Sequence, residues 1–486
     1  MAVDNRPVIY WFRRDLRLRD NPALHWASHQ QRPVLCIFIL DDLSSEWHLG
    51  GASRWWLHHS LNALNDELKT AGNRLQFFAG ETEETLDSIV NTTKAYAVAW
   101  NRRYEPVNIE LDKKIKARYK EKGIEVFSAP GNLNHEPWQV RREGKHPYRV
   151  FTAYWRASLK HQSLPLTATV TKLNSSGKKF KSELKLEQLE LLPAIPWDKD
   201  FPNHWTPGEK GADKNLKSLL KGQITEYDVA RDIPSVDGTS QLSPHLAFGE
   251  ISPRQINASV AKKLKNGSLA KDDNVETFLK EIGWREFAYH LLYHFPKTPE
   301  KPLDVRFAKF PWKKIKPAAL QRWQQGNTGI PLVDAGMRQL WQTGWMHNRV
   351  RMVVGSLLIK NMGYHWREGA NWFWDTLVDA DLASNTMGWQ WVSGCGADAA
   401  PYFRVFNPVR QGERFDPQGE YVRHWVPEIA ALPNKHIHSP WTASTTELEQ
   451  AAIILGQTYP KPIVDLKTSR VEALDRFAKI KTPTQD

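Results

Sequence analysis

Short apolar runs and longer segments with helical spacing alternate through the first 130 residues of the chain. Continuous apolar runs are typical of buried parallel strands, and the segments between them have room for the helices that connect such strands. The pattern predicts an N-terminal α/β domain with a Rossmann-like parallel sheet over residues 1–130. The expected strands are Val8–Phe12, Val34–Leu40, Leu75–Phe78, Ala97–Trp100 and Glu125–Phe127.

The clearest helix of this domain is predicted over residues 53–71. Ser53 is its expected N-cap, because a serine hydroxyl can accept a hydrogen bond from a free N–H group of the first turn. Gly72 is its expected end, since glycine commonly follows the last helical residue. The apolar stripe of this helix consists of Trp56, Leu57, Leu61, Leu64 and Leu68.

The segment after the first strand, Trp11–Arg17, has no glycine-rich turn. A dinucleotide-binding sheet carries such a turn at this place, because glycine lets the backbone approach the pyrophosphate closely. The predicted sheet therefore lacks the usual NAD-binding function.

The composition changes twice along the rest of the chain. Pro, Ser and Lys become frequent over residues 131–215, which we interpret as a long interdomain linker that follows the surface. From residue 216 onward the apolar positions follow helical spacing without strand alternation, for example in 275–293, 336–361 and 369–382. We therefore expect residues 216–486 to form an all-α domain.

The overall composition excludes several classes of protein. Of the 486 residues, 41% are hydrophobic and 25% charged, which is typical of a globular protein and too apolar for a disordered one. No apolar run approaches the ~18 residues of a membrane span, and the N-terminus lacks the apolar region of a secretion signal. We expect a cytoplasmic protein without membrane contact. The two cysteines, Cys36 and Cys395, form no CxxC pattern, so neither a disulfide framework nor a metal site is expected.

Two numbers depart from this background. The formal net charge of +12 fits a polyanionic partner, although a basic surface without any partner fits it equally well. The chain also has 22 tryptophans, and 10 of them lie between Trp284 and Trp391. The packing of a single core does not need so many indoles in so short a stretch.

Two predicted helices carry polar and soft side chains at matching spacing. Glu281, Trp284 and Arg285 lie at positions i, i+3 and i+4 of the first helix, so they share one face. Taken alone, this set fits an exposed ion pair beside a core tryptophan. The second helix repeats the spacing, and the two together could read a nucleobase edge by hydrogen bonds and hold its face by stacking. The second set is Asn348, Arg351 and Met352.

Two further segments have patterns that could indicate ligand binding. The hydroxyl-rich segment Thr239–Pro244 precedes an apolar helix, and its hydroxyls and free N–H groups could hold a phosphate or simply cap that helix. Gly394–Ala399 formally matches the GxGxxA dinucleotide pattern. We reject that match, because the segment lies among helical stretches with no strand before it.

Six segments resemble, in sequence and in order, the photolyase/cryptochrome family, and the resemblance extends from Trp11–Asn21 to His438–Trp441. Agreement over six long motifs is too extensive for coincidence. The resemblance implies a U-shaped FAD in the helical domain and a light-harvesting antenna pigment at the α/β domain, methenyltetrahydrofolate rather than a deazaflavin. The six segments are Gly238–Ser243, Trp284–Phe287, Gly329–Ala335, Gly344–Arg349, Gly388–Trp391 and Asp398–Phe403.

The resemblance also implies which residues hold the FAD. Asn385 would face the flavin N5, where an asparagine favours the fully reduced anion, and Arg351 would pair with Asp379 over the isoalloxazine ring. The implied FAD contacts are Tyr227, Thr239, Ser240, Gln241, Leu242, Ser243, Phe278, Glu281, Arg285, Arg351, Asp379, Ala380, Asp381 and Asn385.

By the same resemblance, three of the clustered tryptophans form an electron-transfer chain. Trp389, Trp366 and Trp312 would carry an electron from the protein surface to the photoexcited flavin. Indole suits this role because it can be oxidised and can pass the hole to a close neighbour. For the other tryptophans core packing remains the interpretation.

The activity within the family is predicted from the lesion pocket. Members that repair cyclobutane pyrimidine dimers have a Glu, an Asn and a Met there, which Glu281, Asn348 and Met352 match. Six-four photolyases have a His-His pair where only His347 precedes an Asn here, and plant-type cryptochromes often have a smaller aliphatic residue in place of Met352. We expect light-driven repair of such dimers, with Glu281, Asn348, Met352 and Asn385 as the catalytic residues.

The expected partner is UV-damaged DNA, bound by a monomer that associates with the nucleoid if the chain is bacterial. Phosphate contacts without sequence preference would precede flipping of the dimer out of the duplex. Two alternatives stay open: a blue-light signalling cryptochrome without repair activity, and a DNA-binding protein with a vestigial flavin fold. The implied DNA contacts are Arg231, Trp284, Asn348, Arg349, Trp391, Arg404 and Gln411.

Overall fold

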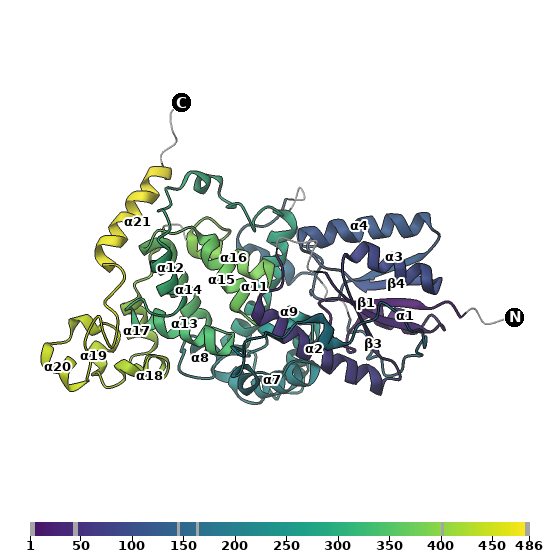
Figure 1. The fold of residues 1–486 in the computed structure, drawn as a ribbon, viewed down its shortest axis with the longest axis horizontal. Helices are drawn as coiled ribbons and strands as arrows, with labels where there is room; N and C mark the ends of the chain where they lie inside the picture. The colour runs from purple at the N-terminus through teal and green to yellow at the C-terminus, as the bar shows by residue number, and fades with distance from the viewer. Residues whose placement is uncertain (1–4, 42–46, 143–145, 162–164, 400–402, 482–486) are drawn as a thin grey trace, which may run out of the picture. The chain divides into compact units, whose positions relative to one another are not determined.

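The computed structural model describes residues 5–41, 47–142, 146–161, 165–399 and 403–481, and Figure 1 shows their elements. The chain divides into two compact units. The first unit comprises residues 1–224, 240–296 and 378–380, and the second comprises residues 225–239, 297–377 and 381–486. The predicted boundaries at 130 and 215 rest on composition and stay a prediction. Ala400–Tyr402 of the motif Asp398–Phe403 lie outside the described residues.

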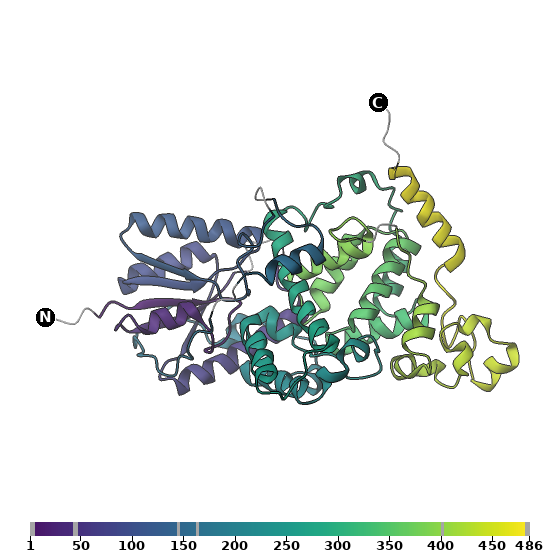
Figure 2. The ribbon, with the colours of Figure 1, turned by 180° about the vertical axis from the view of Figure 1, so that it is seen from behind.

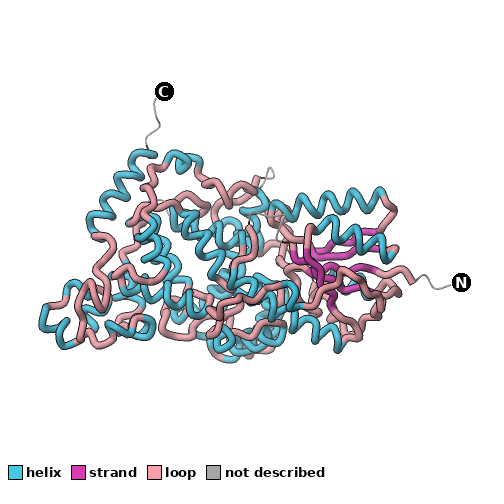
Figure 3. Tube along the Cα trace, in the orientation of Figure 1, coloured by secondary structure: helices cyan, strands magenta, loops and turns pink. Residues whose placement is uncertain are grey.

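The predicted sheet is present in the first unit, with all five strands parallel and ordered β3-β2-β1-β4-β5 (Figures 1 and 3). Val8 of the central strand pairs with Val34 on one side and Ala97 on the other. Every residue of β1 and β2 is buried, as strands covered on both faces require. The strands are β1 (Val8–Phe12), β2 (Val34–Leu40), β3 (Leu75–Ala79), β4 (Ala97–Asn101) and β5 (Glu125–Ala129).

Helices cover both faces of this sheet. Leu86 and Ile89 of α3 (Thr82–Thr93) and Ile115 of α4 (Pro106–Glu121) join the apolar cluster on the face of Ile9. On the other face, Trp26 of α1 (Pro22–Ser28) stacks on Phe127 with ring centroids 4.5 Å apart. The central strands are therefore enclosed within the first unit, whereas the edge strand β5 is partly exposed.

Helix α2 (Gly51–Thr70) confirms the predicted apolar stripe but begins two residues earlier than the sequence indicates. Gly50 is the N-cap, and the prediction of Ser53 as N-cap is wrong. Ser53 is 1% exposed inside the first turn, where its small side chain faces the core instead of the helix end. Trp56 is fully buried and donates from Nε1 to Glu250 Oε1 at 2.9 Å.

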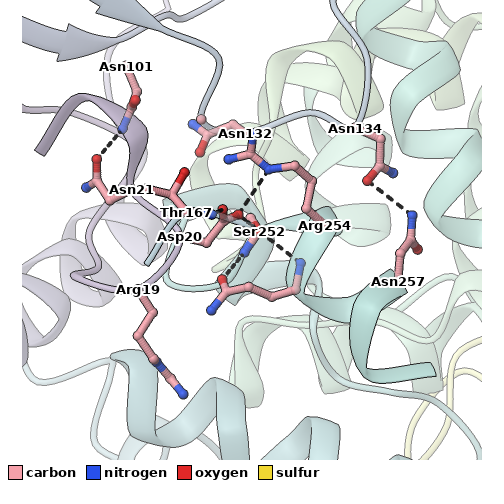
Figure 4. Close-up of polar contacts among 12 residues, drawn as sticks. Arg19, Asp20, Asn21, Asn101, Asn132, Asn134, Thr167, Ser252, Arg254 and Asn257 are labelled. Carbon is pink, nitrogen blue, oxygen red and sulfur yellow. Dashed lines mark hydrogen bonds and ion pairs between the residues drawn. The ribbon is translucent and has the colours of Figure 1, made fainter. Parts of the chain in front are cut away.

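The arginine-rich segment after β1 makes long-range polar contacts within the first unit. Arg17 is fully buried and donates to the carbonyls of Gly131, at 2.5 Å, and Gly249, at 2.8 Å. Asp20 accepts from Ser252 Oγ at 2.5 Å and from Arg254 Nε at 3.0 Å (Figure 4). These contacts join the carboxyl end of β1 to the helical part of the same unit.

After Ala129 the regular elements among the described residues are helices, as expected for an all-α C-terminal region (Figures 2 and 3). The predicted linker is not structureless, because it contains α5 (Phe151–Ser158), α6 (Phe201–His204) and most of α7 (Glu209–Lys221). Among the helices described, none is long and apolar enough to cross a membrane.

The predicted site residues lie on several helices. Gly344, with a φ of 69°, ends α13 (Pro331–Thr343), so the apolar stretch 336–361 is not one helix but α13 and then α14 (Asn348–Ser356), which continues into a π-helical turn at Leu357–Asn361. The site-bearing helices are α8 (Tyr227–Ala230), α9 (Ser243–Phe248), α11 (Asp273–His294), α14 (Asn348–Ser356), α15 (Trp366–Thr376), α16 (Leu382–Ser393) and α17 (Pro408–Phe415).

Candidate functional site

In the first unit, α11 presents the predicted face of Glu281, Trp284 and Arg285. These three side chains are partly exposed, whereas Ile282 and Gly283 between them are buried. The predicted i, i+3, i+4 arrangement is therefore present on one side of the helix. Phe278 precedes it on the same helix and is 1% exposed.

The Trp284 ring is held by a partner that sequence reasoning missed. It stacks on Phe151 of α5 with centroids 3.8 Å apart and an angle of 10° between the planes. Gly283 permits this approach, because a Cβ there would lie 2.5 Å from Cε3 of Trp155 on the same helix α5. The glycine directly before the tryptophan is the one feature of the sequence that could have indicated a closely packed neighbouring helix.

Arg285 and Glu286, which follow Trp284, bind the backbone of the same unit. Arg285 donates to the carbonyls of Asn132, at 2.8 Å, and Leu246, at 3.3 Å. Glu286 is 5% exposed and accepts from the N–H groups of Asn134, at 2.9 Å, and His135, at 3.3 Å. Burial raises the pKa of Glu286 to about 7, against the opposing effect of Arg285. These two side chains position α11 against the segment that follows the sheet.

The hydroxyl-rich turn and the aspartate after α15 meet in the first unit. Ser243 Oγ donates to Asp379 Oδ2 at 2.7 Å, across 136 positions of sequence. Gln241 adopts a φ of 50°, and Ser240 Oγ accepts from the N–H of Leu242 at 3.4 Å. The left-handed residue folds the turn back on itself, so several hydroxyls and a carboxylate gather in a small space. Such groups can bind the hydroxyls and phosphates of a nucleotide.

In the second unit, α14 presents Asn348, Arg351 and Met352, which are exposed or half-buried, while Val350 between them and Val353 after them are buried. His347 caps this helix, because its Nδ1 accepts from the N–H of Arg349 at 3.2 Å. Burial lowers the pKa of His347 to about 4, so the ring is neutral near neutral pH. The helix face agrees with the predicted spacing.

Two arginines of α14 are held inside the second unit. Arg349 forms an ion pair of 2.5 Å with Asp232, next to the predicted DNA contact Arg231, and its guanidinium lies 4.4 Å from the ring of Phe415. Arg351 donates from Nε to the carbonyl of Met346 at 2.7 Å. The predicted pairing of Arg351 with Asp379 stays a prediction.

Helix α16 and its N-cap carry four of the predicted residues, Asp381, Asn385, Trp389 and Trp391. Asp381 is its N-cap and accepts from the N–H of Ser384 at 2.8 Å. Asn385 donates to the carbonyl of Ala370 at 3.0 Å, and Trp391 donates to the carbonyl of Asp398 at 3.1 Å. These bonds fix the direction of the Asn385 amide and the Trp391 ring.

The three tryptophans of the predicted electron chain all lie in the second unit. Trp312 and Trp366 both pack against His365, with ring centroids 5.0 Å and 5.5 Å from it. Trp389 packs against Phe373 at 4.9 Å, in a buried cluster around α15. The bridging ring of His365 was not predicted, although its place directly before Trp366 could have indicated it.

The remaining predicted residues also have defined places. Tyr227 begins α8 and is 5% exposed, and Arg231 directly follows that helix. Arg404 lies 4.8 Å from the ring of Phe406, and Gln411 lies on α17. Thr239 belongs to the second unit, whereas Ala380 belongs to the first. Each unit thus contributes part of the predicted set.

Comparison with known proteins finds similarity along the whole chain. A family model described as DNA photolyase matches residues 8–172, and a model described as the FAD binding domain of DNA photolyase matches residues 278–479. A deoxyribodipyrimidine photo-lyase of Agrobacterium fabrum is 46% identical over 485 residues, which are 100% of both chains. Cryptochrome-2 of Arabidopsis thaliana is 38% identical over 97% of this chain and 78% of its own.

A solved structure has the same fold. The crystal structure of a bacterial class III photolyase from Agrobacterium tumefaciens has a TM-score of 0.94 and 45% identity, and the match covers 99% of each chain.

The residues present fit FAD, because the hydroxyls around Gln241 and the Asp379 carboxylate suit its phosphates and sugar hydroxyls. With family models matched in both halves and relatives aligned over the full length, the chain belongs to the photolyase/cryptochrome family.

Proposed function

We propose that this chain is a light-dependent lyase that splits cyclobutane pyrimidine dimers in DNA. The observation that carries the proposal is the set Glu281, Asn348 and Met352, presented on the exposed faces of α11 and α14. The Agrobacterium fabrum relative, named a deoxyribodipyrimidine photo-lyase, supports the same activity because it aligns over all of the chain.

Binding of damaged DNA begins with phosphate contacts. The net charge of +12 attracts the backbone without regard to sequence. Arg349 takes part only if a phosphate competes with Asp232, its partner at 2.5 Å, whereas Arg404 lies on the surface with no ion pair among the described residues. Arg231 and Gln411 complete the proposed set.

The lesion leaves the duplex more easily than an intact pair, because its stacking and pairing are already broken. Trp284 and Trp391 then offer aromatic faces to the flipped bases, a contact worth about 1–3 kcal/mol per base. Phe151 keeps the Trp284 ring in place, and the bond to Asp398 does the same for Trp391. Preorganised rings lose little freedom when the lesion binds.

Bond cleavage needs an electron. Residues such as Ser240, Ser243 and Asp379 would hold FAD, which in its reduced form would supply light-driven chemistry that lends one electron and takes it back, so the overall reaction would be redox-neutral. Glu281, in its protonated form, donates a hydrogen bond to a pyrimidine carbonyl, where the added charge accumulates. Asn348 holds the polar edge of the bases, and Met352 packs against their apolar side.

Several finer properties belong to this proposal. The antenna pigment is methenyltetrahydrofolate, the DNA-binding form is a monomer, and the chain works in the cytoplasm, associated with the nucleoid if it is bacterial. The second candidate function is blue-light signalling without repair, which the 38% identity with Arabidopsis Cryptochrome-2 over 97% of the chain favours.

Repair of an oligonucleotide with a single thymine dimer tests the proposal. The reduced holoprotein is kept in the dark or in blue light, and the ultraviolet absorbance of intact thymines is followed. Recovery only in the light supports the lyase. If the protein binds FAD and is photoreducible but restores no thymine, the signalling function replaces the proposal.

The role of Glu281 is tested by Glu281→Ala, which removes the donor, with Glu276→Ala as the matched control. Glu276 lies on the same helix, is exposed and forms an ion pair of 2.7 Å with Lys280. Loss of a hydrogen bond to a charged group costs ~1.5–3 kcal/mol, so the repair yield of Glu281→Ala should fall about tenfold or more. Affinity for damaged DNA should change much less. Equal losses in yield and affinity would mean that Glu281 only helps to bind the lesion.

A further inference from the structure

A cavity of about 1060 Å³ lies within the second unit, where the beginning of α17 faces the beginning of α21 (Leu466–Lys481). Both helices are labelled in Figure 1. Ser439 and the short 3₁₀ helix Pro440–Thr442 also contribute to the lining. Cavities of this size accommodate cofactors and nucleotides. Of the residues assigned above to FAD or DNA, only Arg404 and Gln411 line it.

The cavity is lined by more positive than negative charge. Four cations face it, against the carboxylates of Glu413 and Asp465. Asp465 already accepts from the N–H of Thr468 at 2.6 Å, so that carboxylate is engaged at the start of α21. No ion pair neutralises the four cations within the part of the chain that the structure describes. They are Arg404, Arg410, Lys467 and Arg470.

Aromatic rings and amide groups complete the lining. Phe406 is 5% exposed under the guanidinium of Arg404, and Trp441 is half-buried. Asn361 is 2% exposed and donates from Nδ2 to Ser469 Oγ at 2.8 Å, while its buried Oδ1 has no hydrogen-bond partner. Gln411 Oε1 is likewise buried and has no hydrogen-bond partner among the described residues. Neither amide oxygen has accessible surface, so both amides form part of the cavity wall and do not face its interior.

We propose that this cavity binds a nucleotide, separately from the FAD and the lesion. The cations take the phosphate and Trp441 stacks on the base. An inorganic anion would use only the cations, and an apolar ligand only the rings. A nucleotide uses both kinds of group. It comes either from the free pool or from a single-stranded stretch of DNA, and the chemistry of the site is the same for both.

The test measures binding to the holoprotein in the dark, by calorimetry, with undamaged ligands. The probes are thymidine monophosphate, thymidine, inorganic phosphate and single-stranded oligothymidylate. The pocket variant is Lys467→Gln with Arg470→Gln. The control, Lys479→Gln with Lys481→Gln, removes the same charge from the far end of the same helix. All four side chains are exposed, so both variants should fold.

Thymidine monophosphate should bind the pocket variant about tenfold or more weakly, because two charge-assisted contacts are lost, and the control should differ less than twofold. Trp441→Leu should weaken the nucleotide about tenfold and leave inorganic phosphate unchanged, since a stacked base is worth ~1–3 kcal/mol. If the pocket variant binds only oligothymidylate more weakly than the control variant does, the result supports the site and assigns it to single-stranded DNA.

Three results would overturn the proposal: equal weakening by the two double variants, no effect of Trp441→Leu on any probe, or inorganic phosphate binding as tightly as the nucleotide. Because no lesion and no light are used, the outcome is independent of the proposed repair activity.

Discussion

Two glycines approach the ring of Trp389 from different helices and allow a sharp test of how that ring is held. A Cβ on Gly369 of α15 would lie 2.6 Å from Cζ2 of Trp389 and closer still to two neighbouring ring carbons. A Cβ on Gly355 of α14 would meet the same ring at 3.4 Å, an ordinary van der Waals contact. Gly369→Ala must therefore displace the ring or the helix, whereas Gly355→Ala need not.

The magnitudes follow from the packing of the site. Trp389 is 4% exposed, so its ring has little room to move, and overpacking a core costs about 1–3 kcal/mol. Replacing a helical glycine by alanine contributes up to ~1 kcal/mol of stability at either position. Because three ring carbons of Trp389 lie within 2.6 Å of the added Cβ, the upper end of that cost, ~3 kcal/mol, applies to Gly369→Ala. After the offset of ~1 kcal/mol, this variant should lose about 2 kcal/mol in the free energy of unfolding, and Gly355→Ala should gain up to ~1 kcal/mol.

Guanidinium unfolding followed by tryptophan fluorescence measures the difference. A second readout is photoreduction of oxidised flavin, which should slow in Gly369→Ala because electron transfer weakens steeply with distance. Repair by protein reduced beforehand with a chemical reductant should not slow, since it needs no electron from Trp389. If both variants unfold at the same denaturant concentration, the ring is not fixed by the close approach of α15, and the reasoning fails.

Two further predictions concern charge. Glu286 has its pKa raised from 4.5 to about 7 by burial, so the stability it contributes is complete below the lower value and is lost as pH rises through the higher one. Relative to wild type, Glu286→Gln should gain about 2–3 kcal/mol in unfolding free energy between pH 5 and pH 8, measured by denaturant unfolding. If the difference in unfolding free energy between variant and wild type is the same at both pH values, Glu286 does not have a raised pKa. Asp232→Asn, which frees Arg349 from its ion pair, should bind DNA more tightly, whereas Arg349→Gln should bind more weakly with a salt slope smaller by about 1. Affinity in Asp232→Asn equal to or below that of wild type would remove Arg349 from the proposed phosphate contacts.

The α/β fold could be predicted from the sequence because its signal is local. Each strand is a short apolar run, and each predicted run became a strand within two residues of its expected ends. The start of α2 was misplaced because serine suits both an N-cap and a small buried position, and only tertiary packing decides between them. The end of a helix within 336–361 was missed for a similar reason. The apolar spacing continues past Gly344, whose positive φ ends the helix.

For the site, the sequence predicted the faces of α11 and α14 but not the partners that hold them. Spacing along one helix places Trp284 on a face, yet nothing in that spacing identifies Phe151, 133 positions earlier, as the ring stacked on it. The same holds for Asp232 beside Arg349. Such contacts depend on long-range packing, which a local pattern does not contain.

The segment Glu281–Phe287, which ends in the motif Trp284–Phe287, shows that a shared motif does not by itself tell which residues act on the substrate and which hold the helix in place. Glu281 and Glu286 are five residues apart, which places them roughly 140° apart around α11. Glu281 lies on the partly exposed face with Trp284, whereas Glu286 is buried against the N–H groups of Asn134 and His135. One carboxyl faces the proposed substrate and the other fixes the helix that presents it. Substitution of Glu281 should therefore change repair with little change in stability, and substitution of Glu286 should change the pH dependence of stability first.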